Sequence, residues 1–331
     1  MRVPPAIDRL PRFALLDGSS PLHRVERFSA ALANDGGDVD VWIKREDLLP
    51  LAFGGNKLRN LEFLIGAALA EGADTLITAG RRWSNHCRLT AAAGARAGLA
   101  VHLVLTGPRP LPGDEGTNQR LAELLGATIH WTSAEDRAER SALMDRVAGE
   151  VRAAGGRPFV IGVGGTGPVG AAGQVLAGLE LAEQLDAAGI GEAAVVVPSA
   201  TGGTQAGLMT GLALAGPPAR RVVGIAVATP AAELRVTIAG LLDGLEPLAG
   251  VRPAGDAIEL DDDHRGGGYG RPSGAADDAA RLLARTEGIL VDPIYTAKAL
   301  AGVVAGVRDG RLKDSVVFWH AGGLPGLFER L

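Results

Sequence analysis

The chain has 331 residues, of which 47% are hydrophobic, and its 33 Lys and Arg against 38 Asp and Glu give a formal net charge of -5 at pH 7. This composition excludes a disordered chain, and the acidic balance disfavours nucleic acid as a partner. The single Cys87 excludes a disulfide framework, and no apolar run approaches the roughly 20 residues of a membrane helix. We therefore expect a cytoplasmic protein that does not cross a membrane.

Short apolar runs alternate with longer amphipathic segments along most of the chain. Such runs, bounded by glycine, are typical of buried parallel strands, and the segments between them are long enough to be crossover helices. We predict the α/β class with two doubly wound open sheets and a ligand cleft beyond the carboxyl ends of the strands. Residues 251–274, rich in Gly, Asp and Pro, are expected to form a loop or lid, or an edge strand plus a turn. The predicted strands lie within 74–80, 100–107, 127–131, 158–165, 193–203, 220–229 and 314–323.

Glycine is unusually frequent, with 48 residues, or about 15% against roughly 7% in average proteins. In the segment Thr201 to Thr204, the pair Gly202 and Gly203 allows close backbone approach at a helix start, and two threonine hydroxyls can donate to an anion. This segment is a candidate phosphate cup, with a glycine-rich turn that binds no ligand as the alternative. The glycine clusters fall where strands should end or helices begin, at 53–57, 163–167, 200–207 and 320–326.

The chain has only four lysines, so amine chemistry has few candidates. Lys57 alone lies in a glycine-rich turn that opens a predicted helix. The field of the helix N-terminus and partial burial lower the pKa of such an amine and make it a usable nucleophile. A surface lysine without a function is the alternative interpretation.

A second helix is predicted to start near Asn85, with Ser84 at its N-cap. Together with His86 these residues form a terminus that could bind a substrate carboxylate. A plain capping role for Ser84, or nucleophilic Ser/His catalysis, are the alternatives. Cys87 is expected to be a buried, unreactive helix residue. The histidines show no metal-ligand spacing, and no metal site is predicted.

The two tyrosines, Tyr269 and Tyr295, both occupy irregular segments near glycine clusters. A phenol at such a junction is a candidate for acid/base chemistry or for stacking on a ligand ring. Chance placement is the alternative.

Six segments, in this order and at about this spacing, resemble the pyridoxal-phosphate enzymes of the 1-aminocyclopropane-1-carboxylate deaminase and D-cysteine desulfhydrase family. The resemblance extends from about Arg12 to Phe328. The segments are IKREDLLPLAFGGNKLRNLEFL, SNHCRLTAAAGARAGL, TGGTQAGL, GGGYGRPS, EGILVDPIYTAKALAG and HAGGLPGLF.

The resemblance implies a type II pyridoxal-phosphate fold and a homodimer that acts on a small amino acid. It implies a small α/β domain at 52–166 inserted in a large cofactor-binding domain at 1–51 plus 167–331.

The resemblance also implies a role for each candidate residue. Lys57 corresponds to the Schiff-base lysine, and the segment from Thr201 through Gly202 and Gly203 to Thr204 would hold the cofactor phosphate. Asn85 would bond the phenolic oxygen of the pyridine ring, and Ser84 with its neighbours Trp83, Asn85 and His86 would bind substrate. Tyr269 and Tyr295 match two active-site tyrosines that assist the leaving group or orient the α-carbon.

The residue after the second tyrosine divides the family. Deaminases resemble DPxYEGK, whereas desulfhydrases resemble DPxYTGK, and this chain has Thr296. A neutral hydroxyl partner would leave the ring nitrogen unprotonated, which suits β-elimination. The sequence therefore favours a D-cysteine desulfhydrase-like lyase, and His86 in the SNH segment points the same way.

Three positions depart from the family pattern, and they keep other functions open. Trp83, preceded by Arg81 and Arg82, replaces the usual glutamine, and we hypothesise that it reshapes the pocket for a substrate other than cysteine. Ala321 and Asn60 replace a threonine and a lysine near the cofactor. The alternatives are a deaminase or another specialised family member, and a pyridoxal-phosphate binding protein that has lost catalysis.

Overall fold

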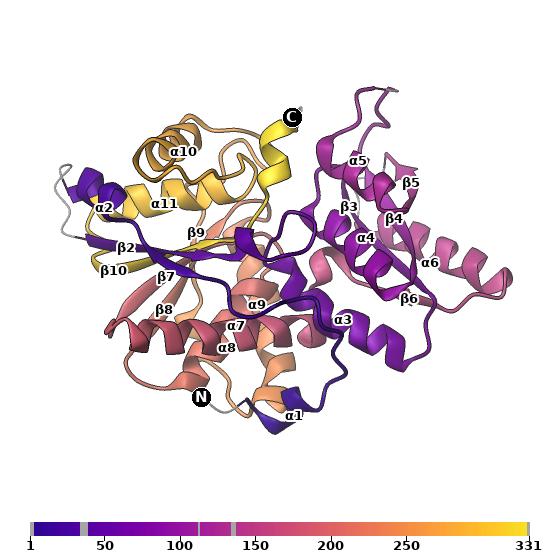
Figure 1. The fold of residues 1–331 in the computed structure, drawn as a ribbon, viewed down its shortest axis with the longest axis horizontal. Helices are drawn as coiled ribbons and strands as arrows, with labels where there is room; N and C mark the ends of the chain where they lie inside the picture. The colour runs from indigo at the N-terminus through magenta and orange to yellow at the C-terminus, as the bar shows by residue number, and fades with distance from the viewer. Residues whose placement is uncertain (1–2, 34–38, 112, 134–136, 330–331) are drawn as a thin grey trace.

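The computed structural model describes residues 3–33, 39–111, 113–133 and 137–329. Strands and helices alternate, and the strands form two separate sheets that lie side by side along the long axis (Figure 1). Among the described helices, none combines the length and the apolar character needed to cross a bilayer. The predicted α/β class with two open, mostly parallel sheets is confirmed.

The larger sheet has six strands in the order β1-β2-β10-β7-β8-β9, and only β1 is antiparallel to its neighbour. Side chains alternate between its faces, so Val195 of β7 packs into one core and Val196 into the other. Helices α7, α8 and α9 cover the first face, and α2, α10 and α11 cover the second (Figure 1). The strands are β1 Leu22–Arg24, β2 Val39–Arg45, β7 Ala193–Ser199, β8 Arg220–Ala226, β9 Glu259–Asp261 and β10 Asp314–His320. The helices are α1 Pro5–Asp8, α2 Glu26–Ala33, α7 Pro168–Ala187, α8 Gly203–Ala215, α9 Ala231–Ala249, α10 Gly274–Glu287 and α11 Thr296–Arg308.

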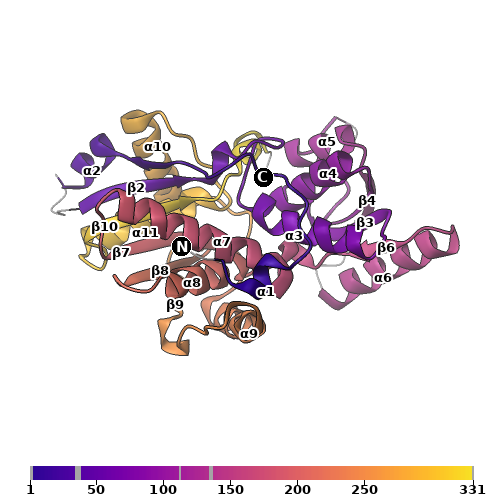
Figure 2. The same cartoon turned by 60° about the horizontal axis from the view of Figure 1, so that its bottom comes forward.

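The smaller sheet has four parallel strands in the order β5-β4-β3-β6. Leu76 of β3 packs into a core with α3 and α4, whereas Ile77 faces α6 on the other side. Helix α3 also packs on α7, so it joins the two sheet units (Figure 2). The strands are β3 Thr75–Arg81, β4 Ala100–Thr106, β5 Thr128–Thr132 and β6 Pro158–Val160, and the helices are α3 Lys57–Ala70, α4 Asn85–Ala97, α5 Thr117–Leu124 and α6 Arg137–Ala153. Short 3-10 turns are η1 Glu46–Leu48, η2 Val163–Gly165, η3 Gly255–Ala257 and η4 Leu324–Phe328.

Several glycines lie inside helices and allow close packing between them. A Cβ at Gly173 in α7 would lie 2.0 Å from the carbonyl oxygen of Arg59 in α3. A Cβ at Gly211 in α8 would lie 2.3 Å from the carbonyl oxygen of Val175 in α7. These distances are too short for any side chain, so glycine brings both α3 and α8 against α7. The glycine surplus, which was expected to lie in turns, therefore also serves helix packing.

Two segments show how local backbone geometry decides an element. The strand predicted within 158–165 ends at Val160, and Gly164 and Gly165, with positive φ angles of 72° and 63°, lie in the short turn η2 that follows. Within 251–274, strand β9 pairs with the edge of the larger sheet, which confirms the edge strand among the predicted alternatives. The domain boundaries at 51/52 and 166/167 stay a prediction.

A buried ion network joins the two units next to the start of α3. Arg59 donates to Glu46 at 2.6 and 2.8 Å, and to both carboxylate oxygens of Glu180 in α7 at 2.9 Å. Lys44 of β2 forms an ion pair with Glu180 and donates to the carbonyl oxygen of Ser20 at 2.6 Å. The network therefore fixes the first turn of α3 against the larger sheet.

Replacing Glu46 with Gln is expected to lower the free energy of unfolding by roughly 3 kcal/mol, because it removes one of the carboxylates that compensate the buried Arg59 guanidinium. Urea unfolding followed by circular dichroism measures this change. Asp40→Asn, at the exposed pair with Arg24, is the control and is expected to leave the midpoint unchanged. Equal midpoints for the two variants would contradict the role given to the network.

Candidate active site

A cavity of about 510 Å³ opens between the two sheets, at the carboxyl ends of β3, β7 and β10. This is the edge at which open α/β sheets bind ligands. Each of the four glycine clusters of the sequence contributes to its wall, so segments far apart in the chain meet here. Their lining glycines are Gly55, Gly164, Gly202 and Gly322.

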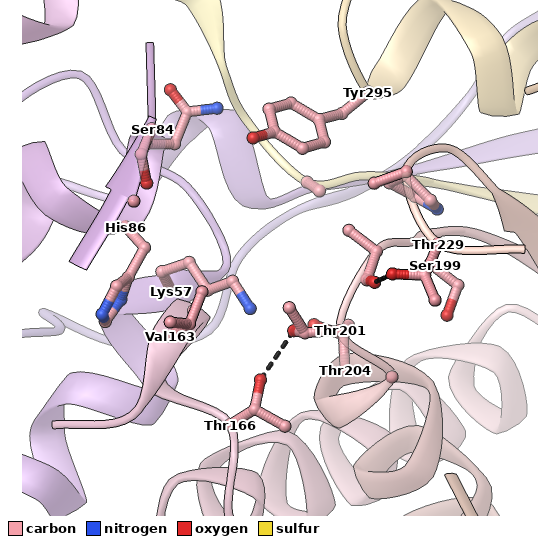
Figure 3. A pocket seen from close by; sticks show the side chains of 18 of the residues that line it. Lys57, Ser84, His86, Val163, Thr166, Ser199, Thr201, Thr204, Thr229 and Tyr295 are labelled. Atoms are coloured by element: carbon pink, nitrogen blue, oxygen red, sulfur yellow. Dashed lines mark hydrogen bonds between the residues drawn. The ribbon is translucent and has the colours of Figure 1, made fainter. Parts of the chain in front are cut away.

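The loop before Lys57 is held by backbone contacts that only glycine permits. A Cβ at Gly322 would lie 2.5 Å from Cα of Gly55, so the first and fourth clusters pack backbone against backbone. Asn56 then donates its amide to the carbonyl oxygen of Ala321 at 3.0 Å and its side chain to Thr204 at 2.8 Å. Lys57 follows as the first residue of α3, and its side chain extends into the cavity (Figure 3).

The amine of Lys57 is chemically unusual. In the described part of the chain, Nζ has no hydrogen-bond or ion-pair partner, and burial lowers its pKa to about 8. An ordinary lysine has a pKa near 10.4, so at pH 8 it is neutral in less than about 1% of molecules. About half of the Lys57 amines are therefore neutral at pH 8, so a far larger share can act as a nucleophile than for an ordinary lysine.

The start of α8 forms a polar cup across the cavity from Ser84 and His86 (Figure 3). Gly202 has φ +79°, and α8 begins at Gly203. The first amide groups of a helix lack intrahelical acceptors. Thr201 accepts a hydrogen bond from Thr166 at 2.6 Å, which ties the second and third glycine clusters together. This geometry suits a phosphate group.

The start of α4 forms the facing wall. Ser84 is the N-cap, and its Oγ accepts from the amide of Cys87 at 3.2 Å. The Oδ1 atom of Asn85 accepts from Asn118 at 3.3 Å, so its amide nitrogen faces Gly323. Ser84 both caps the helix and lines the cavity, and Cys87 is buried with its pKa raised to about 12 by burial.

His86 contributes a neutral ring to the cavity. Burial, followed by the charge of Lys57, lowers the pKa of His86 to about 3. Thr78 donates its hydroxyl proton to the carbonyl oxygen of Ile161 at 2.9 Å, so the 3.0 Å contact with His86 assigns the proton to Nε2. The buried Nδ1 atom is then an acceptor without a partner among the described residues.

The two tyrosines meet on a third side of the cavity. Their hydroxyl groups are hydrogen-bonded to each other, and the ring centroids are 5.8 Å apart. Burial raises the pKa of Tyr269 to about 12 and raises that of Tyr295 well above its usual value. Both phenols are therefore protonated at neutral pH and can act as hydrogen-bond donors or acids.

Two residues without an assigned role in the sequence hold the tyrosines in place. The carboxylate of Asp292 accepts from the amide of Tyr295 at 2.9 Å, and Lys298 donates to the carbonyl oxygens of Arg265 and Gly268 at 2.7 and 2.8 Å, just before Tyr269. The Asp-Pro pair at 292–293 is a turn signal, and it could have indicated the structural role of Asp292 from the sequence.

Three of the proposed site residues lie outside the cavity wall. Thr296 is buried, and its hydroxyl bonds the carboxylate of Asp292. Trp83 packs edge-on against the ring of Tyr269 at 5.9 Å, and Gly203 lies in the first turn of α8. The wall contains further polar residues that no sequence pattern singled out, namely Thr166, Ser199, Thr229, Thr237, Arg140 and Ser141. Among the described residues no group of three or more His, Cys, Asp or Glu could hold a metal ion.

Comparison with known proteins shows which family the chain belongs to. The sequence profile of the family described as "Pyridoxal-phosphate dependent enzyme" matches residues 14–322. The chain belongs to this family. A crystal structure of an ACC (1-aminocyclopropane-1-carboxylate) deaminase homologue superposes with a TM-score of 0.89 at 35% identity, over 98% of this chain and 95% of that one. The threonine deaminase of T.th. (TM-score 0.64, 22% identity, 92% of each chain) and maize serine racemase (0.61, 19%, 92% and 88%) share the fold.

This pyridoxal-phosphate-dependent enzyme has a cavity whose residues fit the cofactor. The cup from Thr201 to Thr204 suits its phosphate, and the neutral amine of Lys57 suits its aldehyde. The Oγ atom of Ser199, at the end of β7 beside the cup, is buried without a hydrogen-bond partner in the described chain. Such an orphaned polar atom is expected to find a partner in a bound ligand.

Capture of the cofactor by the apoprotein is expected to speed up with pH, to reach half of its maximal rate near pH 8 and to level off about one pH unit higher, because the capturing form of Lys57 is the neutral amine and its pKa is about 8. Stopped-flow growth of the visible absorption of the covalently held cofactor, from pH 6 to 10, gives the midpoint. A midpoint near the ordinary lysine value of about 10.4 would contradict the desolvated amine.

Proposed function

We propose that this enzyme is a lyase that deprotonates a small amino acid at Cα, expels its β-substituent, and releases a 2-oxo acid and ammonia. With D-cysteine the expelled group is sulfide. The observation that carries the proposal is that one cavity is lined by the amine of Lys57, the helix terminus at Ser84 and the bonded pair Tyr269–Tyr295. These are a base, a carboxylate site and an acid, the groups that β-elimination requires.

The roles of these residues follow from their charges. The cofactor supplies an electron sink for the carbanion at Cα. The Ser84 hydroxyl and the free amide groups of α4 bind the α-carboxylate. Lys57, with its depressed pKa, takes the Cα proton, and the protonated tyrosine pair gives a proton to the leaving group at Cβ.

Thr296 supports a desulfhydrase-like reaction in preference to ring opening, since it is the neutral residue of the DPxYTGK pattern. Its bond to Asp292 orients it at the start of α11. Deamination of 1-aminocyclopropane-1-carboxylate is the second candidate, favoured by the 35% identity with an ACC deaminase homologue.

Asn60 and Ala321, which depart from the family pattern and raised the possibility of a protein that binds the cofactor without catalysis, both have structural roles. Asn60 donates to the carbonyl oxygen of Gly165 at 3.2 Å and accepts from Gln174 at 2.7 Å, so it fills the α3–α7 crossing. Ala321 accepts from the amide of Asn56 through its backbone. Neither change removes a group from the candidate base or acid, which favours an active enzyme.

The deciding experiment incubates the purified holoenzyme with D- and L-amino acids and with 1-aminocyclopropane-1-carboxylate. Pyruvate and ammonia from cysteine or 3-chloroalanine support β-elimination, and 2-oxobutanoate from the cyclic substrate supports the deaminase. A protein that binds the cofactor but releases no 2-oxo acid is the inactive binder. Activity without a visible cofactor absorption would overturn the proposal.

We also propose a cytoplasmic homodimer. The buried thiol of Cys87 suits a reducing compartment. Phe53 and Phe328 are 57% and 71% exposed, apolar area that a second subunit would cover. Sedimentation equilibrium that gives the monomer mass would contradict the dimer.

A further inference from the structure

The turn before Lys57 has an unusual backbone. Ala52, Phe53, Gly54 and Gly55 have consecutive φ angles of 46°, 66°, 62° and 124°. Two of these residues carry side chains, and such residues rarely adopt left-handed backbone angles. Phe53 is mostly exposed, so its side chain does not anchor the turn. A backbone of this kind persists only where surrounding contacts hold it, and this turn presents the amine that extends into the cavity (Figure 3).

The buried Arg88 of α4 supplies such contacts. Its guanidinium donates to the carbonyl oxygen of Ala52, and to that of Gly54 at 3.3 Å. Arg88 is fully buried, and no carboxylate among the described residues forms an ion pair with it. Because a buried charge is costly unless it is hydrogen-bonded, the cation and the carbonyl oxygens of the turn stabilise each other.

The same guanidinium reaches the facing wall of the cavity. Its Nε donates to Oδ1 of Asn118 at 2.7 Å, and a second nitrogen lies 3.5 Å from Oδ1 of Asn85. Asn118 in turn donates to Oδ1 of Asn85 at 3.3 Å and to the carbonyl oxygen of Trp83 at 3.1 Å. Both donors approach the oxygen of the Asn85 side chain, so its amide nitrogen is the atom available to a ligand in the cavity that Asn85 lines.

The C-terminal segment fixes Asn118 from the other side. Gly116 is the N-cap of α5 and has no side chain, and the carboxylate of Glu329 takes the capping role by accepting from the amide of Asn118 at 2.7 Å. A Cβ at Gly116 would lie 2.2 Å from Oε2 of Glu329, so glycine leaves the room that this carboxylate needs. Glu329 follows β10 and η4, so Asn118 is held from both sheet units.

We propose that Arg88 is a positioning residue for the reaction: together with Asn118 it holds the turn before Lys57 and the side chain of Asn85 in one fixed arrangement, and it keeps water from the Lys57 amine. Arg88 itself does not line the described cavity wall. The proposal rests on the roles proposed above for Lys57 and Asn85 and adds the residue that links them. Without Arg88 the turn relaxes to ordinary backbone angles, and water then reaches Nζ of Lys57.

Labelling of the apoprotein with acetic anhydride from pH 6 to 10 tests this role without cofactor or turnover. The reagent acylates neutral amines, and mass spectrometry reports Lys57 separately from the exposed Lys313, the internal reference. In the wild type we expect half-maximal labelling of Lys57 near pH 8. In Arg88→Met the midpoint is expected to rise by at least about one pH unit, toward the ordinary value of about 10.4, because the amine is then hydrated. His86, with a pKa of about 3, stays neutral over this range.

A second variant separates the two contacts of the network. Asn118→Ala keeps the bonds of Arg88 to the turn and removes the donor to Asn85. It is expected to keep the Lys57 midpoint near pH 8, while the Kd for pyridoxal phosphate, measured by absorption, rises roughly 10-fold through the loss of one hydrogen bond. Arg96→Met is the matched control, because it removes an exposed arginine about two turns later in the same helix, and it is expected to change neither value.

Circular dichroism shows whether each variant is folded. An unchanged Lys57 midpoint in folded Arg88→Met overturns the proposal, and so does a wild-type midpoint equal to that of Lys313. If Arg88→Met does not fold, Asn118→Ala decides, and an unchanged Kd for the cofactor then overturns the proposal. Neither readout involves turnover, so a failure to release any 2-oxo acid would overturn the lyase proposal and leave the role of Arg88 standing.

Discussion

Replacement of Lys57 by alanine is expected to abolish the visible absorption of the covalently held cofactor and to lower turnover by at least about 10³-fold. The reason is that the described cavity wall contains no second lysine. The nearest chemical substitutes, Arg81 and Arg140, are guanidinium groups that do not form Schiff bases and stay protonated at neutral pH. Absorption spectra of the dialysed protein and single-turnover release of 2-oxo acid measure both losses.

Lys313→Ala is the matched control, because it removes an exposed lysine after α11. This variant is expected to keep the absorption and the rate of the wild type. Soaking Lys57→Ala with pyridoxal phosphate tests the cup separately, since reversible binding should persist through the residues at Thr201–Thr204. Turnover by Lys57→Ala near the wild-type rate would show that another group moves the Cα proton.

The parts of the site that the sequence could indicate are local in the chain. Lys57 opens a helix directly after two glycines and an asparagine, and the cup at Thr201–Thr204 is a single strand-to-helix turn. In both places the functional residues and the glycines that mark the start of the helix lie within a few positions of each other, so a local reading of the sequence can find them. Because the chain has only four lysines and two tyrosines, few residues could supply the amine and the phenols of the site.

The parts that escaped prediction depend on contacts between distant segments. Arg140 lies on a regular charged helix, and nothing near it in sequence marks it as a cavity residue. Lys298 acts on a loop 30 to 33 residues away, by donating to the carbonyl oxygens of Gly268 and Arg265. Gly173 and Gly211 are ordinary helix positions until the crossing partners are known. Each of these roles exists only after the helices have packed.

Thr296 was expected to contact the cofactor, but it lies outside the described cavity wall. Thr296 follows the cavity residue Tyr295, but its side chain is buried in the protein interior, where its hydroxyl donates a hydrogen bond to the carboxylate of Asp292, four residues earlier. The Asp292 carboxylate therefore organises the start of α11, with one oxygen on the amide of Tyr295 and the other on that of Thr296. A role of Thr296 toward the cofactor ring stays a prediction.

Substitution of Tyr295 by phenylalanine is expected to lower turnover of cysteine by roughly 10²- to 10⁴-fold, the usual contribution of a general acid. The loss should depend on the leaving group, because chloride leaves without a proton whereas sulfide needs one. With 3-chloroalanine as substrate, Tyr295→Phe is therefore expected to retain most of the wild-type rate. This comparison is an internal control for folding and cofactor binding, since the same protein is used with both substrates.

Tyr269→Phe is expected to have a smaller effect, because it removes the hydrogen-bond partner of Tyr295 and leaves the acid itself in place. The pH dependence gives an independent check. Burial raises the pKa of Tyr269 to about 12 and raises that of Tyr295 well above its usual value. Both phenols therefore keep their protons up to about pH 10, and the cysteine rate should show no decline from tyrosine ionisation in that range. An equal loss of rate with cysteine and 3-chloroalanine in Tyr295→Phe would assign this residue to orienting the α-carbon, and the leaving-group proton would then have to come from another group in the cavity.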